Sequence, residues 1–90
     1  MTMTLAEEIT QRLQVLAPSH LTLLDESALH AGHSGNNGGG HFKVNISSSH
    51  FYQKSHIMRH RAVYDLLADL IPTKIHALSI VANTPDELKG

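Results

Sequence analysis

A strictly alternating stretch at residues 41–47 constrains the fold of this chain more than any other feature. Polar and apolar residues take turns along it, in the order His41, Phe42, Lys43, Val44, Asn45, Ile46 and Ser47. Alternation with a period of two predicts a β-strand that buries one face and exposes the other. The rest of the chain must therefore supply neighbouring strands and a layer that covers the apolar face.

One helix and one strand are predicted before this stretch. Apolar residues recur at helical spacing within residues 4–16, and Thr4 with Glu7 fits a capping box at the helix start. Pro18 ends this helix. Residues 21–25, with the sequence Leu-Thr-Leu-Leu-Asp, predict a strand. The alternating stretch is therefore the second strand of the chain.

A main helix and a third strand are predicted after it. The helix covers residues 55–71, stops at Pro72 and carries an apolar stripe suited to packing on a sheet. This stripe consists of Ile57, Val63, Tyr64, Leu67 and Ile71. Residues 75–82 predict the third strand, and residues 84–87 the start of a short capped helix. The order α-β-β-α-β-(α) indicates an α+β fold.

Connectivity fixes how the three strands meet. Ninety residues suit one domain, so we expect a single domain over residues 1–90. The first two strands are sequential and predicted antiparallel, whereas a helical crossover makes the second and third parallel if they share a sheet. We therefore expect a three-stranded mixed sheet covered by helices. The end of the first strand and the starts of the other two then lie at one rim.

Histidine is in excess in this chain, which has eight histidines and no cysteine. A flexible loop rich in glycine and histidine, at about residues 26–40, joins the first two strands and exceeds the usual length of about 2–5 residues. His30 and His33 lie in this loop, His41 opens the second strand, and His76 lies near the start of the third. Imidazole is the commonest metal ligand in proteins. The gathering of these four histidines therefore predicts an incomplete metal site at the rim.

Each of these histidines also has an interpretation without a metal. His30 and His33 fit solvated residues of a flexible loop. His41 fits an exposed strand residue, and His76 has the parity of the apolar residues that follow it and fits a partly buried core histidine. A further alternative is simple zinc or copper binding by the loop histidines, although a few flexible imidazoles give weak and unselective sites.

Three basic residues, Lys54, Arg59 and Arg61, lie near the start of the main helix. They fit either a phosphate-contacting helix or a solvated flank. Phosphate contacts would make nucleic-acid binding fall steeply with salt. The formal net charge of −1 argues against a general polyanion binder.

Other function classes find little support. No serine or threonine has a recognisable base partner and no carboxylates are paired for acid–base chemistry, so we expect neither an enzyme nor a small-molecule substrate. No apolar run approaches the roughly 18 residues of a membrane span, and no charged-then-apolar leader opens the chain. These observations favour a cytoplasmic protein without a membrane partner.

Four motifs, taken together and in order, make the chain resemble the BolA family. They are Asp25-Glu-Ser-Ala-Leu-His30, His41-Phe-Lys-Val44, Arg59-His-Arg-Ala-Val-Tyr64 and Ile75-His-Ala-Leu-Ser79. The resemblance extends over about residues 5–87, which is nearly the whole chain. It implies a KH-like (type II) α+β fold that lacks a functional G-x-x-G nucleic-acid clamp.

The resemblance also implies a partner and a cofactor. BolA proteins pair as heterodimers with monothiol glutaredoxins, and the complex can hold a [2Fe–2S] cluster in iron–sulfur and iron homeostasis. The cluster ligands are the glutaredoxin cysteine, glutathione and two BolA histidines, which match His30 and His76 here, with His33 as a competitor of His30. A chain without cysteine supplies imidazoles only, so no cofactor is expected in the isolated chain.

A second role implied by the resemblance is DNA binding by a transcriptional regulator of morphology and stress genes. The family's DNA-binding region is the main helix and the turn before it, here residues 51–64, which include Lys54, Arg59 and Arg61. This chain departs from the family pattern there. The usual Phe-x-Gly before the helix is Phe51-Tyr-Gln53.

Overall fold

A single mixed sheet forms the centre of the protein. The computed structural model describes residues 3–26 and 40–89. Within them the strands β1 (His20–Asp25), β2 (Gly40–Ser47) and β3 (Ile75–Asn83) lie in the order β1-β2-β3. β1 pairs antiparallel with β2, and β2 pairs parallel with β3. The predicted strands and their pairing are confirmed.

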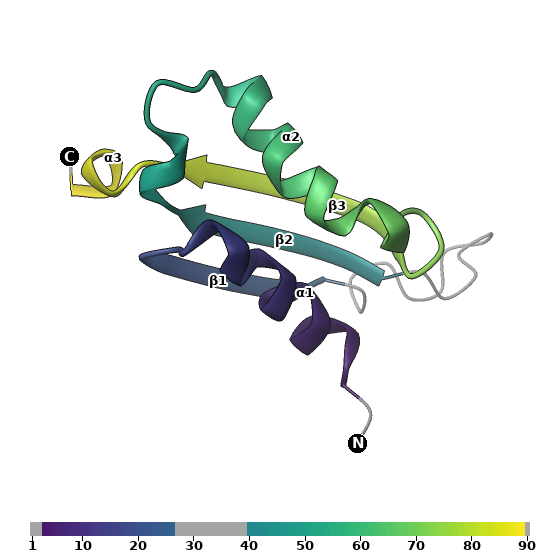
Figure 1. Ribbon diagram of the computed structural model, residues 1–90. Coiled ribbons are helices and arrows are strands. Elements are labelled where there is room, and N and C mark those ends of the chain that lie inside the picture. The colour runs from purple at the N-terminus through teal and green to yellow at the C-terminus, as the bar shows by residue number, and fades with distance from the viewer. Residues whose placement is uncertain (1–2, 27–39, 90) are drawn as a thin grey trace.

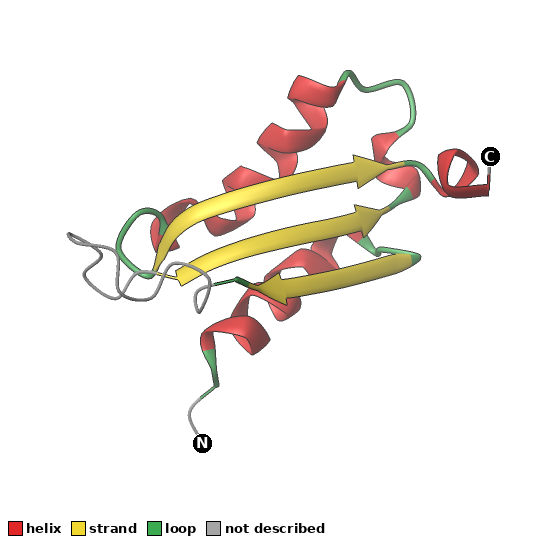
Figure 2. Cartoon of the chain, turned by 180° about the vertical axis from the view of Figure 1, so that it is seen from behind, coloured by secondary structure: helices red, strands yellow, loops and turns green. Residues whose placement is uncertain are grey.

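The helices lie on one face of this sheet. The longer two, α1 (Leu5–Leu13) and α2 (His56–Leu67), lie in front of the strands in Figure 1, and the short α3 (Pro85–Lys89) follows β3. Seen from behind, the other face of the sheet carries none of the helices of residues 3–26 and 40–89 (Figure 2). The predicted α+β architecture is therefore confirmed, and the described helices cover one side of the sheet.

The capping box at the start of α1 is formed as predicted. The Thr4 amide donates to Glu7 Oε1 at 2.8 Å, and the Glu7 amide donates to Thr4 Oγ1 at 3.1 Å. These two bonds satisfy backbone donors that the first helical turn leaves without partners. After Leu13 the chain continues as a 3-10 turn to Leu16, and Ala17 ends it in the left-handed conformation.

The core lies between the sheet and the two longer helices. Its buried apolar residues include Phe42, Val44 and Ile46 from β2, which is the predicted alternation. Further members are Ile9, Leu13, Leu16, Phe51, Val63, Leu67, Leu70, Ile75 and Ala82.

Arg12 links the two helical segments by hydrogen bonds. Its guanidinium donates to Glu8 on α1 and to Asp69, just after α2, at 3.0 Å each.

The buried stripe of α2 differs from the predicted one. Its buried residues are Arg59, Val63 and Leu67, whereas Ile57 is 69% exposed and Tyr64 is 40% exposed. The prediction that Ile57 and Tyr64 face the core is therefore wrong. The buried positions follow one another at intervals of four residues, starting from Arg59. Ile57 and Tyr64 lie off this line on the helix surface and face solvent.

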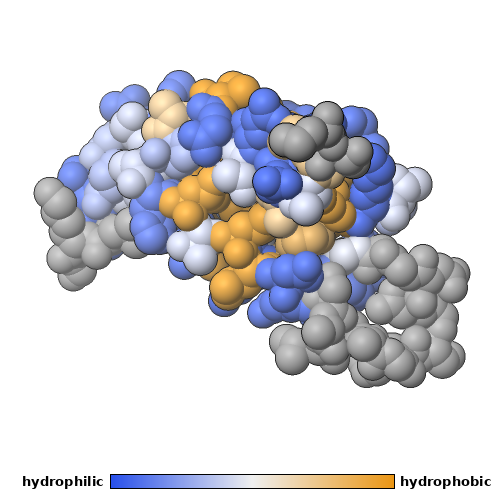
Figure 3. Space-filling view, turned by 90° about the horizontal axis from the view of Figure 1, so that it is seen from below, coloured by the Kyte–Doolittle hydropathy of each residue, from blue (hydrophilic) through white to orange (hydrophobic). Residues whose placement is uncertain are grey.

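The two outer strands of the sheet, β1 and β3, are covered by other side chains to different extents. On β3, the Tyr64 hydroxyl reaches from α2 and donates to the Leu78 carbonyl at 3.2 Å. On β1, Leu24 is 48% exposed, and Leu21 and Leu23 are half-buried. Figure 3 views the molecule from below, and apolar side chains gather on the face that it shows.

Candidate metal centre at the rim of the sheet

All three strands meet at the rim where β1 ends and β2 and β3 begin. The Glu26 amide, just after β1, donates to the His41 carbonyl at 2.7 Å. The Gly40 amide at the start of β2 donates to the Lys74 carbonyl, just before β3, at 2.9 Å. The predicted convergence of strand ends is therefore confirmed. His30 and His33 lie outside the described residues.

Two of the four predicted metal-binding histidines lie side by side at this rim. The imidazole rings of His41 and His76 have centroids 5.2 Å apart and planes inclined by 45°. His41 is half-buried at the start of β2, and His76 is exposed at the start of β3. Residues 35 positions apart in the chain thus form one pair of imidazoles.

A β-bulge places His76 in this pair. Gly40 pairs with Ile75 and His41 pairs with Ala77, so His76 is the extra residue opposite the bond between Gly40 and His41. A bulge re-aims the side chain of the extra residue. The interpretation of His76 as a partly buried core histidine, which rested on its parity, is therefore wrong, because the parity of β3 changes at this residue.

A pocket of about 300 Å³ opens beside His41. Its lining residues are Glu26 just after β1, His41 and Phe42 of β2, and Ala77 and Ser79 of β3. Its polar side chains offer a carboxylate and a hydroxyl next to the imidazole. The rim therefore combines two imidazoles with open space, rather than a closed set of ligands.

Closed metal sites need more ligands than the described rim contains. Structural zinc has four protein ligands and catalytic zinc usually three. Residues 3–26 and 40–89 contain no group of three or more histidine, aspartate and glutamate side chains placed to hold a metal ion. The imidazole pair suits iron, zinc or copper by its chemistry. Within residues 3–26 and 40–89 the rim therefore offers two imidazoles, and a metal ion held there would need ligands from elsewhere.

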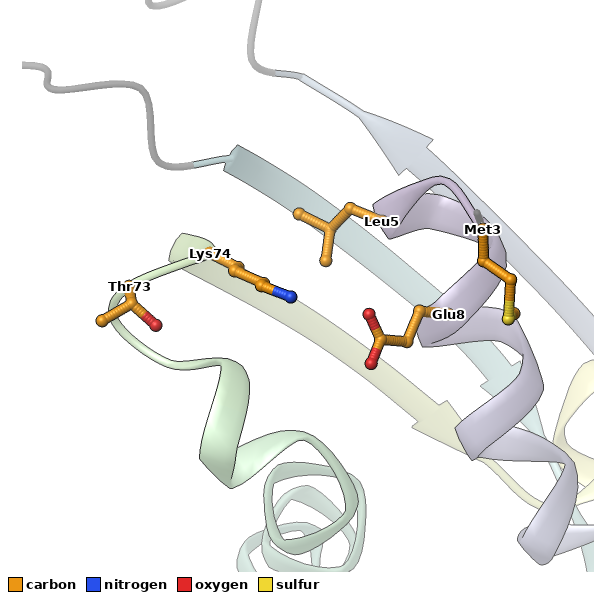
Figure 4. A pocket seen from close by; sticks show the side chains of 5 residues that line it. All are labelled: Met3, Leu5, Glu8, Thr73 and Lys74. Atoms are coloured by element: carbon orange, nitrogen blue, oxygen red, sulfur yellow. The ribbon is translucent and has the colours of Figure 1, made fainter. Parts of the chain in front are cut away.

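A second pocket, of about 330 Å³, lies between the start of α1 and the turn before β3. Figure 4 shows the Glu8 carboxylate and the Lys74 ammonium group pointing toward each other across it. Glu8 already accepts a hydrogen bond from Arg12 at 3.0 Å. The pocket is otherwise lined by Met3, Leu5 and Thr73 and contains no histidine, so it is separate from the rim.

The three predicted nucleic-acid-binding residues do not form one exposed set. Lys54 and Arg61 are exposed, and the Lys54 ammonium group donates to the His50 carbonyl at 2.5 Å. Arg59 is only 6% exposed, so its interpretation as a solvated flank is wrong. Its guanidinium is occupied by protein acceptors.

Arg59 joins α2 to the C-terminal segment. It donates from Nε to the Lys54 carbonyl at 3.0 Å, and from Nη1 to the Ala82 carbonyl at 3.2 Å and to Glu87 Oε1 at 2.8 Å. The bond from Arg59 and a second from the Thr84 amide lower the pKa of Glu87 to about 2. The sequence gives one signal for this contact, the capping residues Thr84 and Glu87, which place the carboxylate at the start of a helix.

The turn before α2 contains a residue in a costly conformation. Gln53 has φ 63°, in the left-handed region that favours glycine. This is the position where the family pattern predicts the glycine of Phe-x-Gly. The backbone therefore keeps the conformation of the glycine although the residue has changed.

Comparison with protein families decides the classification. The profile of the family described as BolA-like protein matches residues 4–87. The chain belongs to the BolA-like family. The BolA domain of SufE1 from Arabidopsis thaliana has the same fold, with a TM-score of 0.82 and 42% identity over 97% of this chain and 99% of that one.

Two curated relatives bear on function. The chain is 42% identical over 87 residues to Protein BOLA1, chloroplastic, of Arabidopsis thaliana, which covers 91% of this BolA-like chain but 54% of that relative. It is 35% identical over 89 residues to the DNA-binding transcriptional regulator BolA of Haemophilus influenzae, covering 98% of this chain and 84% of that protein. The chain thus spans about half the length of the plant relative. The KH-like description is compatible with the fold and stays a prediction.

Proposed function

We propose that this BolA-like chain is a non-enzymatic partner of a monothiol glutaredoxin and supplies histidine ligands to a shared [2Fe–2S] cluster. The observation that carries this proposal is the exposed His76, fixed on β3 beside His41 at the rim where the long 26–40 connection begins and ends. The family membership supports it as well. The proposed ligands are His76 and His30, with His33 as the alternative to His30.

The donor set fits a shared cluster. The chain has no cysteine, so the thiolates must come from the glutaredoxin and from glutathione. Histidine in place of cysteine on one iron raises the reduction potential of a [2Fe–2S] cluster, and this is the chemistry the group supplies when bound. The role of this chain is to hold an imidazole at an accessible position. Because β3 is anchored in the sheet, little ordering entropy is lost when the His76 ring binds.

Reconstitution with a monothiol glutaredoxin tests the proposal. Mixing the two proteins with iron, sulfide and glutathione is expected to give a heterodimer whose absorption and circular dichroism spectra differ from those of the glutaredoxin homodimer. His76→Ala and His30→Ala are each expected to alter these spectra. His50→Ala is the control, because His50 lies beyond the opposite end of β2. Spectra that stay unchanged in both ligand variants would exclude this ligand set.

A second candidate function is DNA binding, which the name of the Haemophilus influenzae relative favours. Of the three predicted cations, Lys54 and Arg61 are exposed, whereas Arg59 is bound to Glu87. Each phosphate contact contributes about one unit to the salt dependence of binding. Lys54→Met and Arg61→Met should each lower the slope of log K against log salt by about 1. A slope that neither substitution changes would refute this role.

The cellular location of the chain also stays a prediction. The sequence-based expectation is a cytoplasmic protein, whereas one plant relative is named chloroplastic. Across residues 3–26 and 40–89, every helix is too short or too polar for a membrane crossing.

A further inference from the structure

We propose that His41 and His76 by themselves bind one transition-metal ion of the zinc(II) and copper(II) class and leave its other coordination positions open to an exogenous ligand. This inference does not rest on the glutaredoxin proposal. It requires neither a cluster nor a partner protein, and it uses His41 in place of a histidine of the 26–40 connection.

The spacing of the two rings carries the inference. Metal–nitrogen bonds of about 2.0–2.1 Å place the centres of two imidazoles about 5 Å apart when both bind one tetrahedral ion. The ring centroids of His41 and His76 are 5.2 Å apart. The separation of the two rings therefore matches the one expected for a shared ion.

The backbone holds the pair in place before any metal binds. His41 lies on the central strand, His76 lies at a bulge of the neighbouring strand, and the pairing of His41 with Ala77 continues along both strands to Ser47 and Asn83. Ligands that are already assembled lose little conformational entropy on binding.

The surroundings suit an open site. A pocket of about 300 Å³ opens on the His41 side of the pair, and Glu26 and Ser79 are among the residues that line it. A carboxylate near a bound cation is favourable by simple electrostatics. Two imidazoles leave a tetrahedral ion with unfilled positions, so the class of ligand that completes the site is a small chelating carboxylate or thiolate.

Copper(II) nitrilotriacetate is the appropriate probe. The chelator fills most of the coordination sphere and leaves adjacent positions that a pair of imidazoles can take, so a site that requires three or more protein ligands does not bind it. Copper(II) has the highest affinity of the divalent first-row metals for such nitrogen ligands. His56 and His60 lie one turn apart on α2 and form another candidate pair. The test therefore uses the full chain with His56→Gln and His60→Gln as its background.

The titration is followed by electron paramagnetic resonance and calorimetry. We expect one chelate per chain, with a spectrum that shows two nitrogen ligands from the protein. His41→Gln and His76→Gln should each weaken binding at least about tenfold, which is about 1.4 kcal/mol. The paired variant His30→Gln/His33→Gln should bind as the background does, and circular dichroism checks that every variant is folded. Binding that survives His41→Gln or His76→Gln, or that is lost in the His30→Gln/His33→Gln variant, would overturn the proposal.

The result is independent of the glutaredoxin experiment. Copper binding by the isolated chain with no cluster in the mixed proteins would leave this site in place and remove the proposed function. Cluster formation in the mixed proteins without copper binding by the isolated chain would rule out this site and leave the cluster role in place.

Discussion

Arg59 and Glu87 form an ion pair in which Nη1 and Oε1 are 2.8 Å apart, although 28 residues separate them in the chain. The arginine side chain is 8% exposed and the glutamate side chain 45% exposed. The same guanidinium also donates hydrogen bonds to the Lys54 and Ala82 carbonyls. The pair therefore fastens α2 to the segment that follows β3.

Arg59→Met should destabilise the protein by about 2–3 kcal/mol, because buried carbonyl groups lose their donor and a carboxylate loses its partner. Methionine keeps the length and apolar stem of the side chain. Urea denaturation measures the change. Arg61→Met is the matched control on the same helix, and since Arg61 is exposed its effect should stay within about 0.5 kcal/mol. Equal effects of the two substitutions would contradict the structural role of Arg59.

The pH dependence of stability should report on Glu87. Its pKa is lowered from 4.5 to about 2 by the bond from Arg59 and by the Thr84 amide, so the folded state binds its proton less readily than the unfolded chain. Such a carboxylate stabilises the folded state above its unfolded pKa, and this stability is lost as the pH falls from 4.5 toward 2.

Thermal unfolding at a series of pH values between about 6 and 3 tests this expectation. Glu87→Gln should make the melting temperature fall less steeply with acid than in the unsubstituted chain. A smaller acid-dependent loss should remain, because Arg12 also lowers the pKa of Asp69. Identical slopes for Glu87→Gln and the unsubstituted chain would show that this carboxylate has an ordinary pKa.

Gln53→Gly should stabilise the protein. A left-handed conformation costs a non-glycine residue about 1–2 kcal/mol, whereas the added chain entropy of glycine costs about 0.5–1 kcal/mol. The net gain is expected to be about 0.5–1 kcal/mol. Gln11→Gly in the exposed part of α1 is the control with the same chemical change, and it should lower stability by a similar amount. Opposite signs for the two substitutions support the assigned φ of Gln53, and a loss at both contradicts it.

Gly40→Ala should be costly at the start of β2. An added Cβ would overlap the ring of Phe42, which is 4% exposed and packed in the core. Alanine usually gains about 0.5–1 kcal/mol over glycine in a strand, but overpacking costs about 1–3 kcal/mol, so a net loss is expected. In a Phe42→Leu background the loss should shrink, and a double-mutant cycle measures the difference. Additive effects would show that the ring does not set the requirement for glycine.

Local patterns in the sequence predict most of the fold. The alternation in residues 41–47 and the helical crossover after it fix the strands, their directions and the rim, and Thr4 with Glu7 fixes the start of α1. The regular helices end earlier than the apolar periodicity does. The final turns of both tighten into 3-10 geometry, at residues 14–16 and 68–70.

The remaining features depend on residues far apart in the chain. The bulge that exposes His76 exists only because β3 pairs with β2 across Gly40 and His41, and no property of residues 75–77 alone indicates it. Burial of Arg59 likewise requires the distant Glu87. The helical pattern alone predicts that a charged residue such as Arg59 faces solvent. A charged side chain is buried only where a partner is present, and the pattern of one segment does not contain that partner.

The most direct test of the cluster proposal is to detect nitrogen from this chain on the iron. The chain is labelled with ¹⁵N-histidine, combined with unlabelled monothiol glutaredoxin, iron, sulfide and glutathione, and the reduced cluster is studied by electron–nuclear double resonance. We expect two ¹⁵N hyperfine couplings, one of which disappears in His76→Gln, whereas both persist in the control His50→Gln. A cluster that forms with no coupling from the labelled chain, or with a coupling unchanged by His76→Gln, would contradict the account.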